Sequence, residues 1–533
     1  MTGEPTRPIA GRASAAATAA FARRQGAARP RLEPTAFREL SGTGLTVSKV
    51  GYGTYRVHVD VPEHHETLAE AIRRGCNCID TSSNYTDGGS ERLIGAVLGD
   101  LIGAGEARRE EIVLVSKVGY LQGQNLDLAV QRQARGNPWP EIVHYQEGCW
   151  HCIHPDFLVD QLERSLARLR CSALDVYLLH NPEYFFAHAL HDSGSQDLPA
   201  LRDEFYRRVE RAFAQFERFI QEGRLSFYGI SSNTFPNPRQ DGETVSLDRV
   251  LAAARRAAAE VLGDPERHHC KVVQLPYNLF ESGALTERNT PLNGASATLL
   301  EAAAAWGVGV LVNRPLNAIR GNSMHRLARP APPPGSDYAG ELETTLRALQ
   351  TTEAALRQEM EGWPQPPRAS DLGPQQQFFF DVGEVLAANL ARLPAGEQWE
   401  MIVGRILAPN IQKALEEALR RCPIERREAW KGRQPAYVEQ LNALLAGIRR
   451  YHEWRAAEQM APLDDRLAAC LPPGTPQATL SQKALQFVAS SPGVAVVLNG
   501  MKRSPYVEDA LAIMEMPSYA DVMGLAAAAY ETS

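Results

Sequence analysis

The chain has 533 residues, of which 44% are apolar and 22% are charged, and its formal net charge is −7. This composition excludes a disordered tether, and it lacks the basic blocks that mark nucleic-acid-binding surfaces. The longest apolar runs, 174–179 and 494–498, are far shorter than the roughly 20 residues that a membrane-spanning helix needs. We therefore expect a soluble protein with a buried core, with neither nucleic acid nor a membrane as partner.

Eight cysteines lie at uneven spacings along the chain. Disulfide frameworks use denser and more regular cysteines, so these residues favour a reducing compartment. We expect free thiols and a cytoplasmic location.

The first residues resemble the basic and apolar parts of a targeting signal, because Arg7 and Arg12 precede an alanine-rich run at 13–20. That run is only weakly hydrophobic, and Gln25 and Gly26 follow it instead of an apolar stretch. Of the two interpretations we favour the second, a disordered N-terminal extension over residues 1–36.

From Phe37 onward, short β-branched runs alternate with longer amphipathic stretches, a pattern typical of repeated βα units around a parallel sheet. Residues 37–40 and 45–49 predict a hairpin that closes one end of the fold. The eight strand-like runs that follow predict an α/β protein of the (β/α)8, or TIM, barrel type. They are 50–54, 77–80, 112–117, 173–180, 226–231, 271–274, 308–313 and 494–498.

The alternation breaks once, between the seventh strand and the helix at 481–488 that introduces the eighth strand. This gap is far longer than ordinary connections, and proline-rich breaks at 330–335, 364–367 and 472–476 divide it into helical stretches. We predict a large, mostly helical insertion. The expected domains are 1–36, the extension; 37–317, barrel strands 1–7; 318–479, the insertion; and 480–533, the barrel completion with strand 8 and the last helix.

A loop that follows a barrel strand opens on the face where active sites of this architecture lie. The insertion is therefore expected to overhang the active site as a lid. The alternative, which we weigh equally, is a packing or oligomerisation module on the flank of the barrel.

Four chemically competent residues fall at or just after predicted strand ends. Asp80 ends the second strand, Tyr85 follows it on the loop, Lys117 ends the third strand and His180 ends the fourth. A buried lysine beside an aspartate stays charged, and a cation near a phenol is expected to lower the pKa of Tyr85 towards the working range. Tyr85 would then donate a proton, and His180 would hydrogen-bond a carbonyl oxygen or share the proton.

Each of these residues taken alone has a structural explanation. Asp80 would cap a helix, Lys117 would extend its charge to solvent, and His180 would be a satisfied interior histidine. Their shared position at strand ends favours the catalytic interpretation.

These residues resemble the tetrad of the aldo-keto reductase family, whose members are (β/α)8 barrels that use Asp, Tyr, Lys and His with NADPH. The resemblance covers most of 37–317 and resumes from 481 to about 516. Its most specific stretches are 79–85 with 88–91, 115–117, 177–182 and 228–233.

The resemblance also implies contacts to a nicotinamide cofactor, NADP(H). Ser232, Asn233 and Gln274 match residues that bind the nicotinamide carboxamide, and Gly53 and Thr54 match residues beneath the cofactor. The segment with Gly500, Lys502, Arg503, Tyr506 and Asp509 resembles the one that holds the adenosine ribose and its 2′-phosphate.

Lys502 and Arg503 also suit a phosphate on physical grounds, because they precede a helix that is predicted to begin near Ser504. On that basis NADPH is preferred to NADH, the alternative being a solvated basic pair. The family often has an aromatic residue stacked on the nicotinamide at the end of the seventh strand, where this chain has Asn313. Arg314 would contact the pyrophosphate instead.

Residues 149–154, Cys-Trp-His-Cys-Ile-His, form a second cluster after the third strand. Cys149 and Cys152, with His151 or His154, would bind a metal or act as a redox switch if they lay at a helix N-terminus. A second paired ligand motif is missing, so we assign no metal and expect a substrate loop in which Trp150 forms an apolar wall.

The leading functional hypothesis is an NAD(P)H-dependent oxidoreductase that acts reversibly on a small-molecule carbonyl or alcohol. One alternative is a cofactor-sensing or scaffold protein that retains the barrel and uses the insertion as an interaction platform. The other is a sugar (lactol) dehydrogenase that works in the oxidising direction.

Overall fold

The computed structural model describes residues 8–191, 197–320, 323–328, 337–363, 380–393, 397–472 and 477–531. The chain divides into two compact units: Met1–Ala328 with Leu463–Ser533, and Arg329–Pro462. Within the described ranges, no helix is both long and apolar enough to cross a bilayer.

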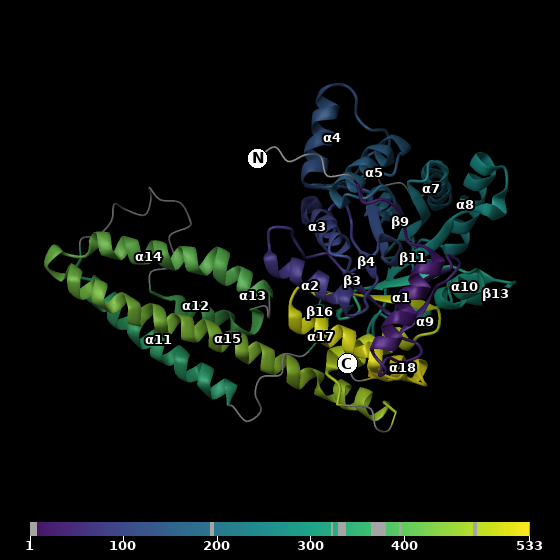
Figure 1. The fold of residues 1–533 in the computed structure, drawn as a ribbon. Coiled ribbons are helices and arrows are strands. Elements are labelled where there is room, and N and C mark those ends of the chain that lie inside the picture. The colour runs from purple at the N-terminus through teal and green to yellow at the C-terminus, as the bar shows by residue number, and fades with distance from the viewer. Residues whose placement is uncertain are drawn as a thin grey trace. The chain divides into compact units, whose positions relative to one another are not determined.

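The first unit contains a closed barrel of parallel strands, which confirms the predicted (β/α)8 fold (Figure 1). The strand ends differ from the predicted ones by one or two residues. Around the barrel the strands follow one another in chain order, and the last pairs with the first. They are β3 (Val50–Gly53), β4 (Cys78–Asp80), β5 (Val113–Val118), β9 (Leu174–His180), β10 (Leu225–Ser231), β11 (Cys270–Pro276), β14 (Gly309–Asn313) and β17 (Val494–Gly500).

The predicted hairpin is present as β1 (Phe37–Leu40) and β2 (Leu45–Ser48), paired antiparallel. Its buried Leu40, Leu45 and Val47 join the same apolar cluster as buried residues of six of the barrel strands, among them Val115, Val176 and Leu311. The hairpin therefore closes one end of the barrel. Gly309 fits there because a Cβ at this position would lie 2.5 Å from the Leu40 side chain.

Amphipathic helices cover the outside of the barrel (Figure 1). In α5, for example, the predicted apolar positions Phe157, Leu158, Leu162, Leu166 and Leu169 are all buried. The helices of this unit that follow the hairpin are α2 (Pro62–Arg73), α3 (Gly89–Gly103), α4 (Gln124–Ala134), α5 (Pro155–Leu169), α6 (Tyr184–His191), α7 (Leu198–Gln221), α8 (Leu247–Leu262), α9 (Gly283–Thr286), α10 (Leu299–Ala305), α16 (Leu480–Ser490), α17 (Ser504–Ala512) and α18 (Val522–Glu531).

Short antiparallel sheets lie in the segments that connect the barrel strands and helices. The loop after β5 folds into a sheet of β6 (Tyr120–Leu121), β8 (Cys149–His151) and β7 (Val143–Gln146). Two hairpins lie further along the chain: β12 (Thr290–Leu292) with β13 (Ala295–Ala297), and β15 (Asn317–Arg320) with β16 (Ser323–Arg326).

The expectation that residues 1–36 are disordered is wrong for the described residues 8–36. They contain helix α1 (Ala15–Ala28), whose N-cap Ser14 accepts a hydrogen bond from the Ala17 amide. The Ala13 amide donates to the buried Asp175 carboxylate at 2.6 Å. Alanine is the best helix former, and the buried Phe21 and the Thr18 hydroxyl, which accepts from the Thr46 amide, contact the rest of the unit.

We predict that Phe21→Ala lowers the free energy of unfolding by about 3 kcal/mol, because Phe21 is 3% exposed and packs edge-on against Phe37. Chemical denaturation measures this loss. Arg23→Ala on the exposed face of α1 is the control, and an equal effect of the two variants would show that α1 is not docked through Phe21.

The second unit, Arg329–Pro462, is helical where it is described, as predicted for the insertion. Its boundaries differ from the expected 318–479, because residues 318–328 and 463–479 belong to the barrel unit. Residues 318–328 include most of the β15–β16 hairpin. The proline-rich breaks at 330–335, 364–367 and 473–476 lie outside the described residues. Its helices are α11 (Tyr338–Met360), α12 (Val382–Asn389), α13 (Glu397–Ile402), a π-helical turn (Val403–Leu407), α14 (Ala408–Arg421) and α15 (Arg427–Ala469), the last of which continues past Pro462.

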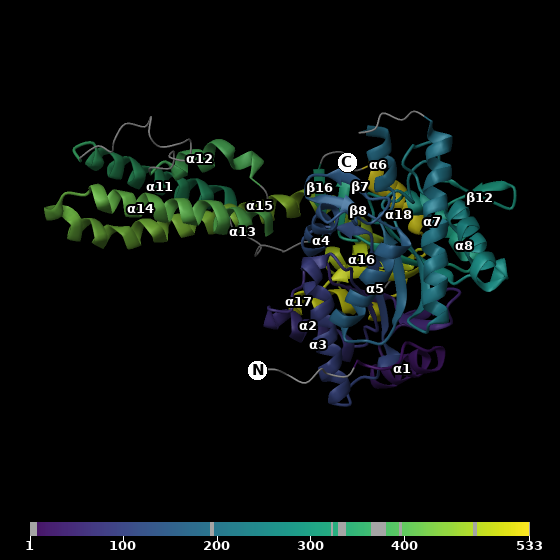
Figure 2. The same cartoon turned by 90° about the horizontal axis from the view of Figure 1, so that it is seen from above.

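Helices α11, α14 and α15 lie side by side (Figures 1 and 2) and share one apolar core that includes Leu349, Leu415, Trp430 and Leu444. A buried carboxylate, Glu353, accepts hydrogen bonds from the first amides of α12 and from the Tyr437 hydroxyl. The unit therefore has a core of its own. Its proposed role as a lid or as an oligomerisation module stays a prediction.

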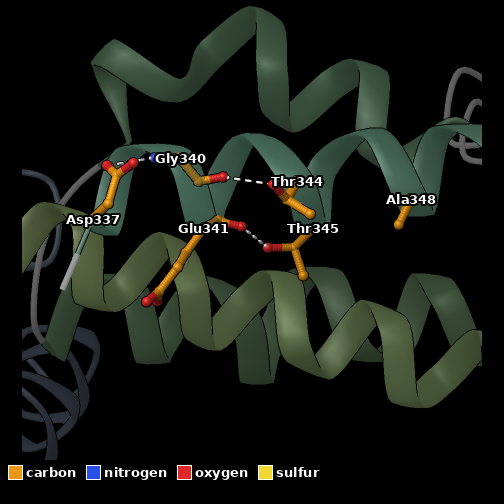
Figure 3. A pocket seen from close by; sticks show the side chains of 6 residues that line it. All are labelled: Asp337, Gly340, Glu341, Thr344, Thr345 and Ala348. Carbon is orange, nitrogen blue, oxygen red and sulfur yellow. Dashed lines mark hydrogen bonds between the residues drawn. The ribbon is translucent and has the colours of Figure 1, made fainter.

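A surface hollow of about 430 Å³ runs along the first turns of α11 (Figure 3). The Asp337 carboxylate caps Gly340, and Thr344 and Thr345 donate back to carbonyl groups of their own helix. The helix itself thus satisfies these polar groups, and nothing about the hollow points to a ligand.

Candidate active site

The parallel register brings the predicted strand-end residues to one edge of the barrel. Asp80 pairs with Gly53 on one side and Val115 on the other, and His180 pairs with Ser231. Lys117 pairs with Leu178 on β9. The C-terminal strand ends therefore converge, which is where this architecture builds active sites.

Lys117 is the centre of the site and is completely buried. Its Nζ donates hydrogen bonds to Asp80 Oδ2 at 2.8 Å, to the Thr81 carbonyl at 2.8 Å and to the Tyr85 hydroxyl at 3.1 Å. An ammonium group has three N–H donors, so all of them are used. The Tyr85 oxygen consequently accepts a hydrogen bond from Lys117, and its own proton is free to be donated elsewhere.

Electrostatics at this centre differ in one respect from the sequence-based expectation. Burial alone would lower the pKa of Lys117, but Asp80 and Tyr85 outweigh it, so its pKa is raised and Lys117 is a cation. Burial also raises the pKa of Tyr85 above its ordinary value, although Lys117 acts in the opposite direction. The expected lowering is therefore wrong: Tyr85 is a neutral phenol that carries a proton at neutral pH.

His180 lies beside Tyr85, with ring centroids 5.8 Å apart and the rings edge to face. Its Nδ1 lies 3.0 Å from the Ser82 hydroxyl, and its backbone carbonyl lies 2.7 Å from His151 Nε2. Burial, with a smaller contribution from the Lys117 charge, lowers the pKa of His180 well below its usual value. His180 is therefore neutral.

The sheet of β6, β8 and β7 provides an aromatic wall that sequence reasoning missed. The Tyr120 ring lies 4.7 Å from the His180 ring, and its hydroxyl accepts from Asn181 and donates to Tyr184. Tyr145 stacks flat on Tyr184 at 4.0 Å. The signal in the sequence was the unusual length of the loop after the third strand, but spacing alone did not show which side chains would turn inward.

The residues expected beneath the cofactor lie at adjacent strand ends. Gly53 ends β3 and pairs with both Asp80 and Gly500, while Thr54 is buried and donates its hydroxyl to the Asp80 carbonyl. Gly500 is exposed, and a Cβ at this position would meet nothing within 4 Å. Of these three positions, Gly500 alone is exposed, and it lies beside Gly53 in the register.

The three residues expected to bind the carboxamide lie at or just after neighbouring strand ends, and protein groups already bond the side chains of Ser232 and Gln274 and the backbone N–H of Asn233. Gln274 donates from Nε2 to Asp80 Oδ1 at 2.7 Å, and its Oε1 accepts from Ser231 at 3.1 Å. Ser232 Oγ accepts from the Thr234 amide, and the Asn233 amide donates to Glu183. A carboxamide would have to displace part of this network to contact Gln274.

Glu183 is a buried carboxylate that sequence reasoning missed. Its Oε1 holds the Asn233 amide at 2.8 Å, whereas its Oε2 has no hydrogen-bond partner among the described residues. Burial raises the pKa of Glu183 to about 7. The signal was present in the stretch His-Asn-Pro-Glu, because this glutamate follows His180 by three residues.

Asn313 and Arg314 follow the seventh barrel strand as expected. Asn313 Nδ2 lies 3.3 Å from Gln274 Oε1, and Arg314 forms an ion pair with Glu281 at 3.0 Å. Asn313 Oδ1 and Arg314 Nε are buried polar atoms without a hydrogen-bond partner among the described residues. Asn313 Oδ1 and Arg314 Nε are therefore available to form hydrogen bonds with a ligand.

The segment after β17 carries the expected cations. Lys502 and Arg503 precede α17, which begins at Ser504, and Arg503 and Ser504 are exposed. Tyr506 lies in the first turn of α17 and is half-buried. Asp509 is instead engaged within the protein, because its carboxylate accepts hydrogen bonds from Thr479 and Ser481 at the start of α16.

Neither Cys149 nor Cys152 of the cysteine–histidine segment lies at a helix N-terminus, although His154 does. Cys149 and His151 lie on strand β8, and α5 begins only at Pro155, with His154 as its N-cap. Burial raises the pKa of Cys149, and it raises that of Cys152 to about 12, so both are thiols. Trp150 is half-buried and packs against His144. Within the described ranges, no group of three or more ligand-type side chains is arranged to hold a metal ion.

The fold and the convergent strand ends define a (β/α)8 barrel with a polar edge built around a buried lysine. A sequence profile described as the aldo/keto reductase family matches residues 49–303. The matched segment, 255 of the 533 residues, is similar to the aldo/keto reductase family.

Individual relatives are distant. The chain is 25% identical over 265 residues to an uncharacterized oxidoreductase of Bacillus subtilis, covering 49% of this chain and 70% of that protein. It is 28% identical over 261 residues to the NADH-specific methylglyoxal reductase of Escherichia coli, covering 46% and 68%. An aldo/keto reductase of Klebsiella pneumoniae in complex with NADP and acetate aligns with a TM-score of 0.41 and 16% identity, covering 92% and 94% of the two chains.

Proposed function

We propose that this protein is an NADP(H)-dependent oxidoreductase that interconverts a carbonyl compound and the corresponding alcohol, with Tyr85 as the proton donor. The observation that carries the proposal is the Lys117 centre, in which one buried cation contacts both Asp80 and the Tyr85 hydroxyl. In this proposal Asp80, Tyr85, Lys117 and His180 are the catalytic residues.

The strand-end edge suits a dinucleotide. Asn313 Oδ1 and Arg314 Nε are buried without hydrogen-bond partners among the described residues, and a Cβ at Gly500 would meet nothing within 4 Å. Lys502 and Arg503, at the N-terminus of α17, suit a phosphate group. When bound, a nicotinamide cofactor supplies or accepts the hydride.

In the proposed reaction, side chains of the site donate a proton and a polar contact to the oxygen of the substrate. Tyr85 is a neutral phenol whose oxygen is held by Lys117, so its free proton is directed by geometry to a substrate oxygen. Asp80 keeps Lys117 charged and in place, and Gln274 in turn fixes Asp80. His180 stands beside Tyr85 as the second polar contact to that oxygen.

The eight cysteines support the location that the composition suggests. All of them are free, and seven are buried. Free thiols are typical of a reducing compartment, so we propose that the protein works in the cytoplasm.

The proposal is tested by titrating the full-length protein with NADPH and NADH by fluorescence, followed by a panel of aldehydes, ketones and sugars with absorbance of the reduced cofactor as the readout. We expect binding and turnover. Binding with no turnover in either direction would replace the proposal with the cofactor-sensing or scaffold alternative, and failure to bind either nucleotide would overturn the cofactor assignment.

We predict that the double variant Lys502→Ala, Arg503→Ala weakens NADPH binding by about 10- to 100-fold, because two charge-assisted contacts to the 2′-phosphate are lost. NADH lacks that phosphate, so its affinity should change little. Fluorescence titration measures both, with Arg23→Ala as the control. Equal losses for the two nucleotides would contradict the assignment; the NADH preference of the Escherichia coli relative makes this comparison informative.

A further inference from the structure

A buried carboxylate, Glu183, joins the segments that leave two neighbouring barrel strands at the active-site edge. It follows His180, the last residue of β9, by three positions, and its Oε1 accepts a hydrogen bond from the Asn233 amide at 2.8 Å. Asn233 lies two residues after Ser231, which ends β10 and pairs with His180. Glu183 is therefore held beside the strand ends that carry the proposed site.

The surroundings of Glu183 compensate its charge poorly. Glu183 is 3% exposed, and its Oε2 is buried without a hydrogen-bond partner in the described part of the chain. The charged side chain that acts on it, Glu243, has the same sign. The other titratable groups that it faces are the phenols of Tyr120 and Tyr184, which are neutral.

The other buried carboxylate at this edge differs in this respect. Asp80 forms an ion pair with Lys117 at 2.8 Å, so these two charges compensate each other. Burial, with a smaller contribution from Glu243, raises the pKa of Glu183 to about 7, although hydrogen bonds from backbone amides act in the opposite direction. Glu183 therefore gains an uncompensated negative charge as the pH rises through about 7.

In the proposed reaction the nicotinamide ring has to lie close to Tyr85 and His180, because the hydride and the Tyr85 proton go to the same carbonyl group. The oxidised ring carries one positive charge, and the reduced ring carries none. A buried negative charge nearby therefore stabilises the oxidised ring selectively. We propose that Glu183 is a specificity-determining residue for the redox state of the cofactor, whose carboxylate favours binding of NADP⁺ over NADPH. This inference rests on the proposed function and deepens it.

The size of the preference follows from the charges. Opposite unit charges about 10 Å apart, at an effective dielectric constant of about 20, change an equilibrium constant by about tenfold. For the wild-type protein we expect the dissociation constant of NADP⁺ to fall about fivefold relative to that of NADPH between about pH 6 and about pH 8.5. Both nucleotides carry the same 2′-phosphate, so titration of that phosphate cancels in the ratio of the two constants.

Fluorescence titration of the full-length protein with NADP⁺ and with NADPH measures this ratio at both pH values. Glu183→Gln has no charge but keeps an oxygen that accepts from the Asn233 amide. We expect this variant to lose the pH dependence and to shift the ratio about tenfold towards NADPH at about pH 8.5. A wild-type ratio that does not change with pH would overturn the proposal without any variant, and so would an unchanged ratio in Glu183→Gln.

Glu217→Gln is the matched control. Glu217 is also a fully buried carboxylate, but it accepts hydrogen bonds from the Tyr228 hydroxyl and from the amide of His269, which directly precedes β11. It therefore lies at the opposite end of that strand from Gln274. We expect Glu217→Gln to leave the ratio unchanged. Equal shifts in the two variants would show that loss of any buried charge has this effect, and would overturn the assignment to Glu183.

Unfolding of the cofactor-free protein tests the charge of Glu183 separately. A glutamate whose pKa is raised from about 4.3 in the unfolded chain to about 7 in the folded protein makes the fold less stable as the pH rises between these values, because the folded state then binds more protons. Glu183→Gln removes this effect, so chemical denaturation should show its stability rising relative to wild type from about pH 5 to about pH 7. An equal difference at both pH values would overturn the charge assignment.

The outcomes separate this inference from the proposed function on which it rests. Failure of the wild-type protein to bind either nucleotide would overturn the proposed cofactor, and the inference with it. Binding of both nucleotides with a ratio that does not depend on Glu183 would overturn the inference alone.

Discussion

Replacement of Tyr85 by phenylalanine is expected to lower turnover by about 10²- to 10⁴-fold, which is the usual contribution of a positioned general acid. The ring stays in place, because it packs against Tyr55 and beneath Lys117, and only the proton-donating hydroxyl is lost. Cofactor affinity should therefore be unchanged. The rate is followed by absorbance of the reduced cofactor, and the affinity by fluorescence titration.

Tyr55→Phe is the matched control for this experiment. Tyr55 lies 5.1 Å from the Tyr85 ring and is 64% exposed. We expect it to retain turnover within a few-fold of wild type. Comparable losses in the two variants would show that ring packing, and not the Tyr85 proton, limits the reaction.

Replacement of Lys117 by methionine is expected to abolish measurable turnover and to lower the free energy of unfolding by about 3–5 kcal/mol. The methionine fills similar space, but Asp80 is then a buried carboxylate that keeps only the Gln274 amide as a partner. Tyr85 also loses the cation that orients its oxygen. Chemical denaturation and the absorbance assay measure the two effects separately.

The double variant Lys117→Met, Asp80→Asn separates stability from catalysis. Removing both charges should restore much of the stability, because no unpaired charge is left buried, but it should not restore turnover. Lys483→Met breaks another largely buried ion pair, with Asp464 at 2.7 Å, and should cost stability without affecting turnover. Recovery of activity in the double variant would show that Lys117 is only a structural ion.

The barrel and the four strand-end residues were predictable because both depend on local signals. The eight strands are short β-branched runs separated by amphipathic helices, so their positions follow from periodicity. Once the strands are placed, the parallel topology alone brings Asp80, Lys117 and His180 to one edge. That is why the contact of Lys117 with Asp80 could be expected although 36 residues separate them in the chain.

Features that depend on tertiary packing were not predictable. Helix α1 has little apolar surface, and the segment that leads into it is held by Asp175, which lies 162 residues from Ala13 in the sequence. The direction of the pKa shift of Tyr85 is set by how completely the ring is buried, which no motif states. Gln274 and Asp509 occupy the predicted positions, but their side chains are bonded to protein groups that only the fold brings near.

The most direct test of the central claim is the transfer of deuterium from NADPH deuterated at nicotinamide C4 to the carbon of a carbonyl substrate from the panel, followed by mass spectrometry. The account predicts deuterium in the alcohol product with the wild-type protein and essentially none with Tyr85→Phe, although both bind NADPH. No deuterium in the product of the wild-type protein with any carbonyl compound, or equal transfer by both proteins, would contradict it.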